Sequence, residues 1–273
     1  MIQPALPMPA HMERRLAGDP LLLLLDVDGT LAPIAPRPEY ATVPEDTRVL
    51  LEQLARTPGV LVSILSGRAA DDAWRIVGVS GIWSIGNHGI EVRDPAGEIT
   101  VQAELSQFAG TIAAAVTRAR ALESEAPGIV VEDKRWTASV HYRLAHPSRV
   151  PALTAAVQGI ADSLGLRLTH GKEVLELRPP VEMDKGIAAL ALADRLGATG
   201  SEGSVLCAGD DRTDEDAFRV LRAAHPDAVT VRVGAEAGRP VADSEAEFFV
   251  DDTRAMFALL QRILELRSQT ATL

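Results

Sequence analysis

Five leucines run directly into two aspartates in the stretch LLLLLDVDGTLAP at residues 21–33. An unbroken apolar run of this kind is typical of a strand buried on both faces of a sheet. Burying an unpaired carboxylate is costly, so Asp26 and Asp28 are expected at the exit of the strand, paired or bound to a cation. Gly29 allows a sharp turn there. Taken alone, the stretch is also compatible with a solvated turn after the strand.

Short apolar runs and helical patterns alternate along most of the chain. The apolar runs lie at residues 21–27, 60–65, 82–85, 204–208 and 229–233, and the helical patterns at 44–56, 69–77, 184–196, 213–223 and 253–266. This alternation predicts an α/β fold with a parallel sheet flanked by helices. Ligands of such folds bind beyond the carboxyl ends of the strands.

The alternation breaks within residues 97–180. The pattern there predicts helix, strand, strand, repeated twice, with elements at 105–122, 129–133, 137–142, 149–164, 167–169 and 174–177. Residues 128–180 hold seven basic and five acidic side chains within an acidic chain. We therefore predict a flexible N-terminus at 1–19, a core domain at 20–96 and 181–267, and an inserted α+β cap domain at 97–180.

Composition excludes several classes of function. Acidic residues outnumber basic ones 38 to 27, for a net charge of -11, which disfavours nucleic acids and anionic membranes. No apolar segment approaches the ~20 residues of a membrane span, and the N-terminus does not resemble a secretory signal. The single cysteine rules out a disulfide within the chain. We expect a cytoplasmic protein.

Two further segments carry polar groups that could bind a phosphate. Ser66 and Gly67 end the run at 60–65, where a hydroxyl and a free backbone can bind a phosphate, although serine-glycine turns are common. Lys185 begins the helix at 184–196 and could hold a phosphoryl oxygen, although a lone lysine in a first turn is usually solvated.

The segment after the run at 204–208 is harder to explain without a ligand. It holds five acidic residues within seven positions, namely Asp210, Asp211, Asp214, Glu215 and Asp216. A capped helix needs one or two acids at its start, so five indicate a bound cation. Because the potential ligands are all oxygens, Mg²⁺ is the predicted cofactor.

In this order the motifs resemble the haloacid-dehalogenase-like phosphatases. Those proteins carry DxDGT, a serine or threonine at a strand end, a lysine and GDDxxD, which stand here as DVDGT at 26–30, Ser66, Lys185 and GDDRTD at 209–214. The resemblance implies a Rossmann-like core with an inserted cap. It also implies that Asp26 attacks the phosphorus, that Asp28 protonates the leaving oxygen and then activates water, and that Ser66 and Lys185 hold the phosphate.

The resemblance implies a metal site as well. Mg²⁺ would be bound by Asp26, Asp210 and the backbone carbonyl of Asp28. Asp211 and Asp214 would either contact the ion directly or hold its ligands in place. Which of Asp211 and Asp214 touches the metal is left open.

Shorter motifs resemble the trehalose-6-phosphate phosphatases within that group. They are SGR at 66–68, GNHG at 86–89, HYR at 141–143, GK at 171–172 with ELRP at 176–179, and GDDRTDE at 209–215. The resemblance implies hydrolysis of trehalose 6-phosphate, the last step of trehalose synthesis. The substrate-binding residues that it implies are Gly67, Arg68, Asn87, His88, Glu132, Lys134, Lys172 and Glu176.

Two alternatives remain at this point. A related capped phosphatase acting on sucrose 6-phosphate or mannosyl-3-phosphoglycerate shares the core motifs, and a non-catalytic sugar-phosphate sensor would share the fold. Members of the family are often fused to a synthase domain, for which 273 residues leave no room. A separate trehalose-6-phosphate synthase is therefore a possible partner.

Overall fold

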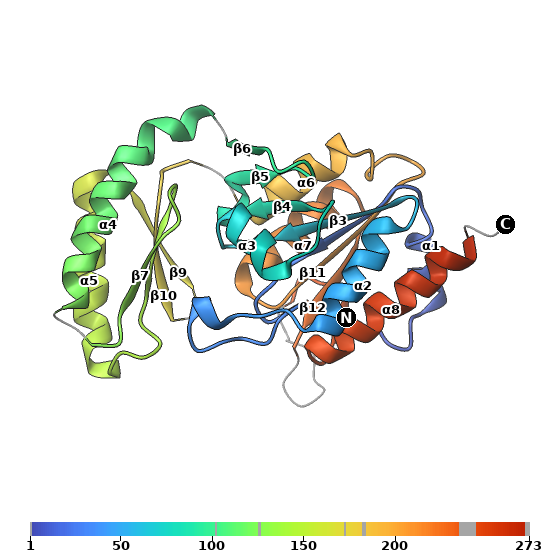
Figure 1. The fold of residues 1–273 in the computed structure, drawn as a ribbon, viewed down its shortest axis with the longest axis horizontal. Coiled ribbons are helices and arrows are strands. Elements are labelled where there is room, and N and C mark those ends of the chain that lie inside the picture. Colours follow the sequence, from blue (N-terminus) through green and yellow to red (C-terminus); the bar gives the residue numbers. More distant parts are fainter. Residues whose placement is uncertain are drawn as a thin grey trace. The chain divides into compact units, whose positions relative to one another are not determined.

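A computed structural model describes residues 2–101, 103–124, 127–171, 173–181, 184–234 and 244–270. The chain divides into two compact units. The core unit comprises Met1–Thr100 and Met183–Leu273, and the cap unit comprises Val101–Glu182. Figure 1 draws both units and labels their elements where there is room.

Strands and helices alternate through the core unit. Its strands are β1 (Gln3–Pro4), β2 (Leu21–Leu25), β3 (Val60–Leu65), β4 (Trp83–Gly86), β5 (Glu91–Arg93), β6 (Ile99–Val101), β11 (Ser204–Gly209), β12 (Val229–Val233) and β13 (Phe248–Val250). Its α-helices are α1 (Ala10–Arg15), α2 (Glu45–Arg56), α3 (Ala70–Val77), α6 (Lys185–Arg195), α7 (Arg212–Ala224) and α8 (Thr253–Thr270), with short 3₁₀ turns at Pro38–Tyr40 and Asn87–Gly89. No helix within the described residues is long and apolar enough to cross a membrane.

The core sheet has the strand order β1-β13-β12-β11-β2-β3-β4-β5-β6. Neighbours from β1 through β4 run parallel, and β5 runs antiparallel to β4. This confirms the predicted α/β fold, with a central parallel sheet flanked by helices (Figure 1). The strand order places β11, β2, β3 and β4 side by side, so their carboxyl ends share one edge.

The five leucines of β2 are all buried because both faces of the sheet are covered. Alternate side chains of a strand point to opposite faces. Leu21, Leu23 and Leu25 pack into a cluster with residues of α1, α2 and α8, whereas Leu22 and Leu24 pack with residues of α6 and α7. A strand covered in this way has no polar face, and its first polar side chain comes after its last residue.

The N-terminal segment differs from the flexible start expected from the sequence. β1 pairs with β13, and α1 buries Met12 against the core together with Ala5 and Leu16. A two-residue strand and a six-residue helix are too short to give a periodic pattern, and the prolines around them interrupt the sequence further.

The cap unit contains a four-stranded antiparallel sheet in the order β7-β8-β10-β9. Its elements are a 3₁₀ turn at Ala103–Phe108, α4 (Ala109–Glu123), β7 (Val130–Asp133), β8 (Ala138–His141), a 3₁₀ turn at Pro147–Arg149, α5 (Val150–Leu164), β9 (Arg167–Gly171) and β10 (Val174–Arg178). One face of this sheet packs on α4 and α5 through apolar side chains such as Val131, Val140 and Leu175. The other face carries Glu132 of β7, Ser139 and His141 of β8, and Glu176 of β10.

Candidate active site

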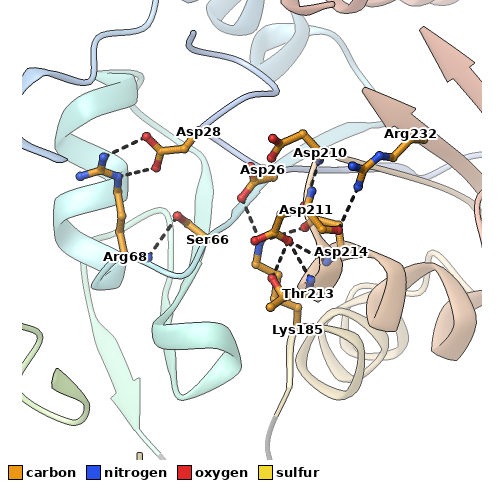
Figure 2. Close-up of polar contacts among 10 residues, drawn as sticks. All are labelled: Asp26, Asp28, Ser66, Arg68, Lys185, Asp210, Asp211, Thr213, Asp214 and Arg232. Carbon is orange, nitrogen blue, oxygen red and sulfur yellow. Dashed lines mark hydrogen bonds and ion pairs between the residues drawn. The ribbon is translucent and has the colours of Figure 1, made fainter. Parts of the chain in front are cut away.

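The polar residues that follow neighbouring parallel strands gather at one edge of the core sheet. Asp26 follows β2, Ser66 follows β3, Asn87 follows β4 and Asp210 follows β11. The backbone continues the strand pairing to this point, since the Asp26 amide donates to the Ala208 carbonyl at 3.0 Å. Figure 2 shows the side chains at this edge, and the predicted motifs meet there as the parallel order requires.

Lys185 forms the centre of the site. It is the first residue of α6 and only 2% exposed. Its ammonium donates to Asp26 Oδ1 at 2.9 Å and to Asp214 Oδ1 at 2.8 Å, so it bridges the carboxylates that follow β2 and open α7 (Figure 2). A fully buried lysine is rare unless it is paired, and this one has two anionic partners.

The first turn of α7 fixes the acidic segment. Asp211 caps the helix, accepting hydrogen bonds at its Oδ1 from the Thr213 and Asp214 amides at 2.8 and 3.1 Å. Asp214 Oδ2 in turn accepts from the amides of Asp210 and Asp211 at 3.0 and 3.1 Å. Two of the five acids are therefore used in a capping box that also orients the Lys185 partner.

Burial and like charge shape the protonation of these groups. Burial raises the pKa of Asp26 to about 7, against the opposing effect of Lys185, with Asp211 and Asp210 raising it further. Burial alone would lower the pKa of Lys185, but the carboxylates of Asp214 and Asp26 outweigh it and raise that pKa well above its usual value. The lysine therefore stays charged at any ordinary pH.

The pKa values of the other three carboxyl groups shift in different directions. Burial raises the pKa of Asp210 to about 7, helped by the charges of Asp214 and Asp211. Burial also raises the pKa of Asp214 well above its usual value, although Lys185 opposes it. For Asp211 the burial effect is overcome by Lys185 and by hydrogen bonds from Thr213 and Asp214, so its pKa lies below its usual value. The site concentrates more negative charge than its single lysine compensates.

Three of these carboxylates could hold a metal ion. Asp26, Asp210 and Asp214 each offer an oxygen, and these oxygens lie within 4.8 Å of one another. All the donors are carboxylate oxygens, the type that Mg²⁺ prefers. Asp211 is outside this group and its Oδ1 is used by the helix cap. Gly29 lets the backbone after Asp28 approach closely, because a Cβ there would lie 2.2 Å from Asp210 Oδ2.

The turn after β3 brings Arg68 onto Asp28. Arg68 Nε and Nη2 donate to the two Asp28 carboxylate oxygens at 2.7 and 2.9 Å, and Arg68 Nη1 lies 3.4 Å from Asp72 Oδ2. The Ser66 hydroxyl accepts from the Arg68 amide at 3.2 Å. Figure 2 shows the Asp28 carboxylate directed at Arg68 rather than at the group around Asp26.

The GNHG segment forms a tight turn locked against its neighbours. Asn87 and His88 both adopt positive φ, at 49° and 55°. The backbone N–H of Asn87 donates to the Arg68 carbonyl at 2.6 Å, and the backbone N–H of His88 donates to the Ser66 carbonyl at 3.2 Å. A Cβ on Gly67 would lie 2.6 Å from the His88 ring. Gly67, Asn87 and His88 therefore support the turn that carries Ser66.

The predicted cap residues lie together on the polar face of the cap sheet. Strand register sets Glu132 and Glu176 opposite Ser139 on the strand between them. Glu176 Oε1 accepts from Lys134 Nζ and from the Ser139 hydroxyl, both at 3.1 Å. Glu132 Oε2 lies 2.9 Å from His141 Nε2. Lys172 falls outside the described residues.

Residues 24–254 match the profile of the trehalose-phosphatase family. The chain belongs to the trehalose-phosphatase family. Curated relatives agree: a trehalose-phosphate phosphatase of Mycolicibacterium paratuberculosis is 39% identical over 209 residues, or 76% of this chain. An uncharacterized glycosyl hydrolase of Mycobacterium tuberculosis is 37% identical over 225 residues, or 81% of this chain. The chain spans about half the length of the former (53%) and 17% of the latter.

Solved structures share the fold of this trehalose-phosphatase family member. A trehalose-6-phosphate phosphatase related protein superposes with a TM-score of 0.79 at 28% identity, covering 91% of this chain and 99% of that one. The C-terminal domain of a Candida albicans trehalose-6-phosphate phosphatase gives a TM-score of 0.78 at 23% identity, covering 97% and 99%. At that identity the second match supports the fold alone.

Sequence reasoning assigned no role to several residues that support this site. Arg232 Nη1 donates to the Asp211 carbonyl at 3.0 Å and lies 3.5 Å from Glu215, so it fixes the acidic loop from β12. Its only signal is that it is the single charged residue in the strand VTVRV. Ser139 carries no signal in the sequence and His141 stands there only as part of the HYR motif at 141–143, so the contacts of these two residues with Glu176 and Glu132 appear only in the structure.

Proposed function

We propose that this chain hydrolyses trehalose 6-phosphate to trehalose and phosphate, through an aspartyl-phosphate intermediate, with Mg²⁺ as cofactor. The observation that carries the proposal is the Lys185 bridge. A buried ammonium between Asp26 and Asp214, with Asp210 close by and Ser66 after the neighbouring strand, combines a nucleophilic carboxylate with a cationic group that can hold a phosphate. The name of the M. paratuberculosis relative supports the substrate.

The metal fits the donor set. We assign Mg²⁺ to Asp26, Asp210 and the backbone carbonyl of Asp28, with Asp214 adjacent. Both oxygens of Asp214 already accept hydrogen bonds, so we give it the role of holding Lys185 and the loop. When bound, the ion would neutralise the crowded carboxylates and polarise the phosphate.

In the first step a carboxylate oxygen of Asp26 attacks the phosphorus. The bond between phosphorus and the sugar oxygen breaks, and Asp28 donates a proton to that oxygen as it leaves. Lys185 fixes the rotation of the Asp26 carboxylate through Oδ1 and stays positively charged beside the phosphoryl group. The Ser66 hydroxyl holds a second phosphoryl oxygen.

In the second step Asp28, now ionised, takes a proton from water. The resulting nucleophile attacks the phosphorus, the bond between phosphorus and Asp26 breaks, and phosphate leaves. Asp26 is thereby restored as a carboxylate and Asp28 as an acid.

The cap unit supplies the groups for the sugar. We propose that Glu132, Lys134, Lys172 and Glu176 bind hydroxyls of the glucose ring that lies distant from the phosphate. Carboxylates and an ammonium form directional hydrogen bonds to hydroxyls. His141 and Ser139 hold the two glutamates in fixed orientations before the sugar arrives.

Phosphate release from a panel of phosphate esters tests the proposal. With Mg²⁺ present, kcat/KM should be highest for trehalose 6-phosphate, lower for glucose 6-phosphate, and lower still for sucrose 6-phosphate and mannosyl-3-phosphoglycerate. A preference for either of the last two would identify the related phosphatase instead. Asp26→Asn serves as the matched inactive control, since it conserves side-chain shape.

A binding test separates an enzyme from a sugar-phosphate sensor. Beryllium fluoride mimics a phosphoryl group on a nucleophilic aspartate, so it should bind the parent with Mg²⁺ but not Asp26→Asn. A protein that binds trehalose 6-phosphate without turnover and ignores beryllium fluoride would be a sensor.

The compartment and the partner are inferred from the substrate. We propose that the protein acts in the cytoplasm and receives trehalose 6-phosphate from a separate synthase. Co-purification or channelling between the two proteins, against free diffusion of the intermediate, would test the partnership.

A further inference from the structure

Arg68 makes ion pairs in two directions from a buried position. Its side chain is 9% exposed, and its guanidinium group pairs with Asp28, whose side chain is 37% exposed. The contacts of Nε and Nη2 with the two Asp28 oxygens, at 2.7 and 2.9 Å, form a bidentate pair that fixes the plane of the carboxylate as well as its position. Nη1 points to Asp72 on α3 at 3.4 Å.

The backbone of Arg68 is fixed more firmly than that of a surface loop. Its amide donates to the Ser66 hydroxyl at 3.2 Å, and its carbonyl accepts from the Asn87 amide at 2.6 Å. Because the backbone of Arg68 is held at its amide and its carbonyl, a change in the Arg68–Asp28 pair comes from rotation of side chains and not from movement of this loop.

The orientation of Asp28 in this pair is not the one that acid catalysis requires. Both carboxylate oxygens of Asp28 accept hydrogen bonds from Arg68 (Figure 2), so neither can present a proton to a leaving oxygen while the bidentate pair is intact. The proposed proton donor must turn at least one of these oxygens to the leaving oxygen. Asp28 must therefore exchange its contact with Arg68 for one with the substrate.

Asp72 provides the charge that this exchange needs. A buried guanidinium that loses its carboxylate partner is strongly disfavoured. Asp72 Oδ2 lies 3.4 Å from Arg68 Nη1, a nitrogen that does not contact Asp28, so this ion pair does not depend on the orientation of Asp28. Asp72 is itself balanced by Arg75, at 3.8 Å on the same helix.

We propose that Arg68 is a positioning residue for Asp28 rather than a substrate-binding residue, and that Asp72 is the exchange partner that retains Arg68 while Asp28 faces the substrate. This inference rests on the acid role of Asp28 in the proposed function. It replaces the contact between Arg68 and substrate that the sequence resemblance implies.

The test compares two substrates that differ in their need for a proton. The sugar oxygen of trehalose 6-phosphate must be protonated as it leaves, whereas p-nitrophenolate leaves without help. The ratio of the two kcat/KM values reports only steps up to departure of the leaving group, so the shared hydrolysis of the aspartyl-phosphate does not enter it. A structural defect lowers both values and leaves the ratio unchanged.

Arg68→Lys keeps the charge but loses the fork. We expect it to lower kcat/KM for trehalose 6-phosphate by about 10- to 100-fold, and that for p-nitrophenyl phosphate by less than about 3-fold, as for a misplaced catalytic group. Trehalose 6-phosphate binding to the unreactive Asp26→Asn protein should change by less than about 3-fold when Arg68→Lys is added, since a positioning residue does not contact the ligand.

Asp72→Asn should also lower kcat/KM for trehalose 6-phosphate more than that for p-nitrophenyl phosphate. We expect the ratio of the two values to fall by about 2- to 5-fold, because one partly exposed ion pair is lost. Asp71→Asn is the matched control. Asp71 precedes Asp72 on the same helix and pairs with Arg93 and Arg75. It should change the ratio by less than about 2-fold, because its change removes a surface charge away from Arg68. Thermal melting confirms that each variant is folded, and Asp72, being half-exposed, can be replaced even if Arg68→Lys is unstable.

Four results would overturn the inference. These are an equal loss on both substrates, a loss of trehalose 6-phosphate binding parallel to the loss of kcat/KM, no loss at all in Arg68→Lys, and an effect of Asp71→Asn as large as that of Asp72→Asn. A parent that is inactive on trehalose 6-phosphate but active on another alkyl phosphate refutes the proposed substrate alone, and the same ratios are then measured with that ester. A parent inactive on every alkyl phosphate overturns both proposals.

Discussion

Replacing Asp210, one of the proposed Mg²⁺ ligands, with asparagine should stabilise the metal-free protein at neutral pH. Burial and the charges of Asp214 and Asp211 raise the Asp210 pKa from 3.8 to about 7. The folded protein therefore holds a proton on Asp210 that the unfolded chain has lost. Above pH 7 the folded state must carry the unfavourable charge, which Asp210→Asn removes.

The size of the expected gain in the free energy of unfolding follows from the difference between the folded and unfolded pKa values of Asp210. A shift from 3.8 to about 7 corresponds to at most about 4 kcal/mol, at about 1.4 kcal/mol per pKa unit. The asparagine amide must still find hydrogen-bond partners in a partly buried site, which offsets about 1 to 3 kcal/mol of this. We expect a net gain in the free energy of unfolding of about 1 to 3 kcal/mol at pH 8.

The stability difference between Asp210→Asn and the parent should change with pH in one direction. Because the folded pKa is raised, the Asp210 contribution to stability is fully present below pH 3.8 and is lost as pH rises toward 7. The advantage of Asp210→Asn should therefore grow between pH 5 and pH 8. Asp26 changes the parent in the same direction, whereas the lowered pKa of Asp211 acts only below this window.

Urea unfolding of the parent and Asp210→Asn in EDTA, at half-unit steps from pH 5 to pH 8, measures the difference. Subtracting the two proteins cancels the contributions of the histidines and of other groups that do not interact with Asp210, whereas the lower Asp26 pKa in Asp210→Asn adds to the expected difference in the same direction. Saturating Mg²⁺ should reverse the order at pH 8, because only the parent binds the ion fully. A variant that is less stable than the parent by the same amount at every pH in EDTA would refute the electrostatic reasoning.

The remaining predictions concern activity. Asp26→Asn should lower kcat by several orders of magnitude with an unchanged melting temperature in EDTA or a higher one; substantial residual turnover in folded protein would contradict the covalent mechanism. EDTA should abolish phosphate release and Mg²⁺ should restore it, whereas Ca²⁺, with longer bonds and more ligands, should restore little; full activity in EDTA would rule out the metal. Glu132→Ala and Glu176→Ala should each reduce kcat/KM for trehalose 6-phosphate by roughly 10- to 150-fold while leaving that for p-nitrophenyl phosphate nearly unchanged. Equal losses on both substrates would make these two residues structural.

The sequence predicts the core of the site well because one physical rule places it. A strand buried on both faces is apolar to its end, and parallel neighbours end at the same edge. Each apolar run therefore points to a polar residue at that edge, and Asp26, Ser66 and Asp210 all lie there. The alternation of strands and helices predicts the α/β fold by the same logic, as the structure confirms.

The side-chain pairings could not be predicted in this way. Arg68 and Asp28 lie 40 positions apart, and their pairing depends on rotamers that no periodicity records. The two functions of Asp214, as lysine partner and as half of a capping box, appear only when α6 and α7 are placed together. Short elements such as β1 carry too few residues to form a pattern.

The turn at Asn87–Gly89 also restricts which sequences this scaffold accepts. His88 fills the space where a Gly67 side chain would lie, and a Cβ on Gly89 would come within 2.6 Å of the Asp184 carbonyl at the start of α6. The loop after β3, the loop after β4 and the helix that carries Lys185 thus fit together as one piece. In a mutational library, positions 67 and 88 should be varied jointly, and a graft of this site onto another sheet must transfer all three segments at once.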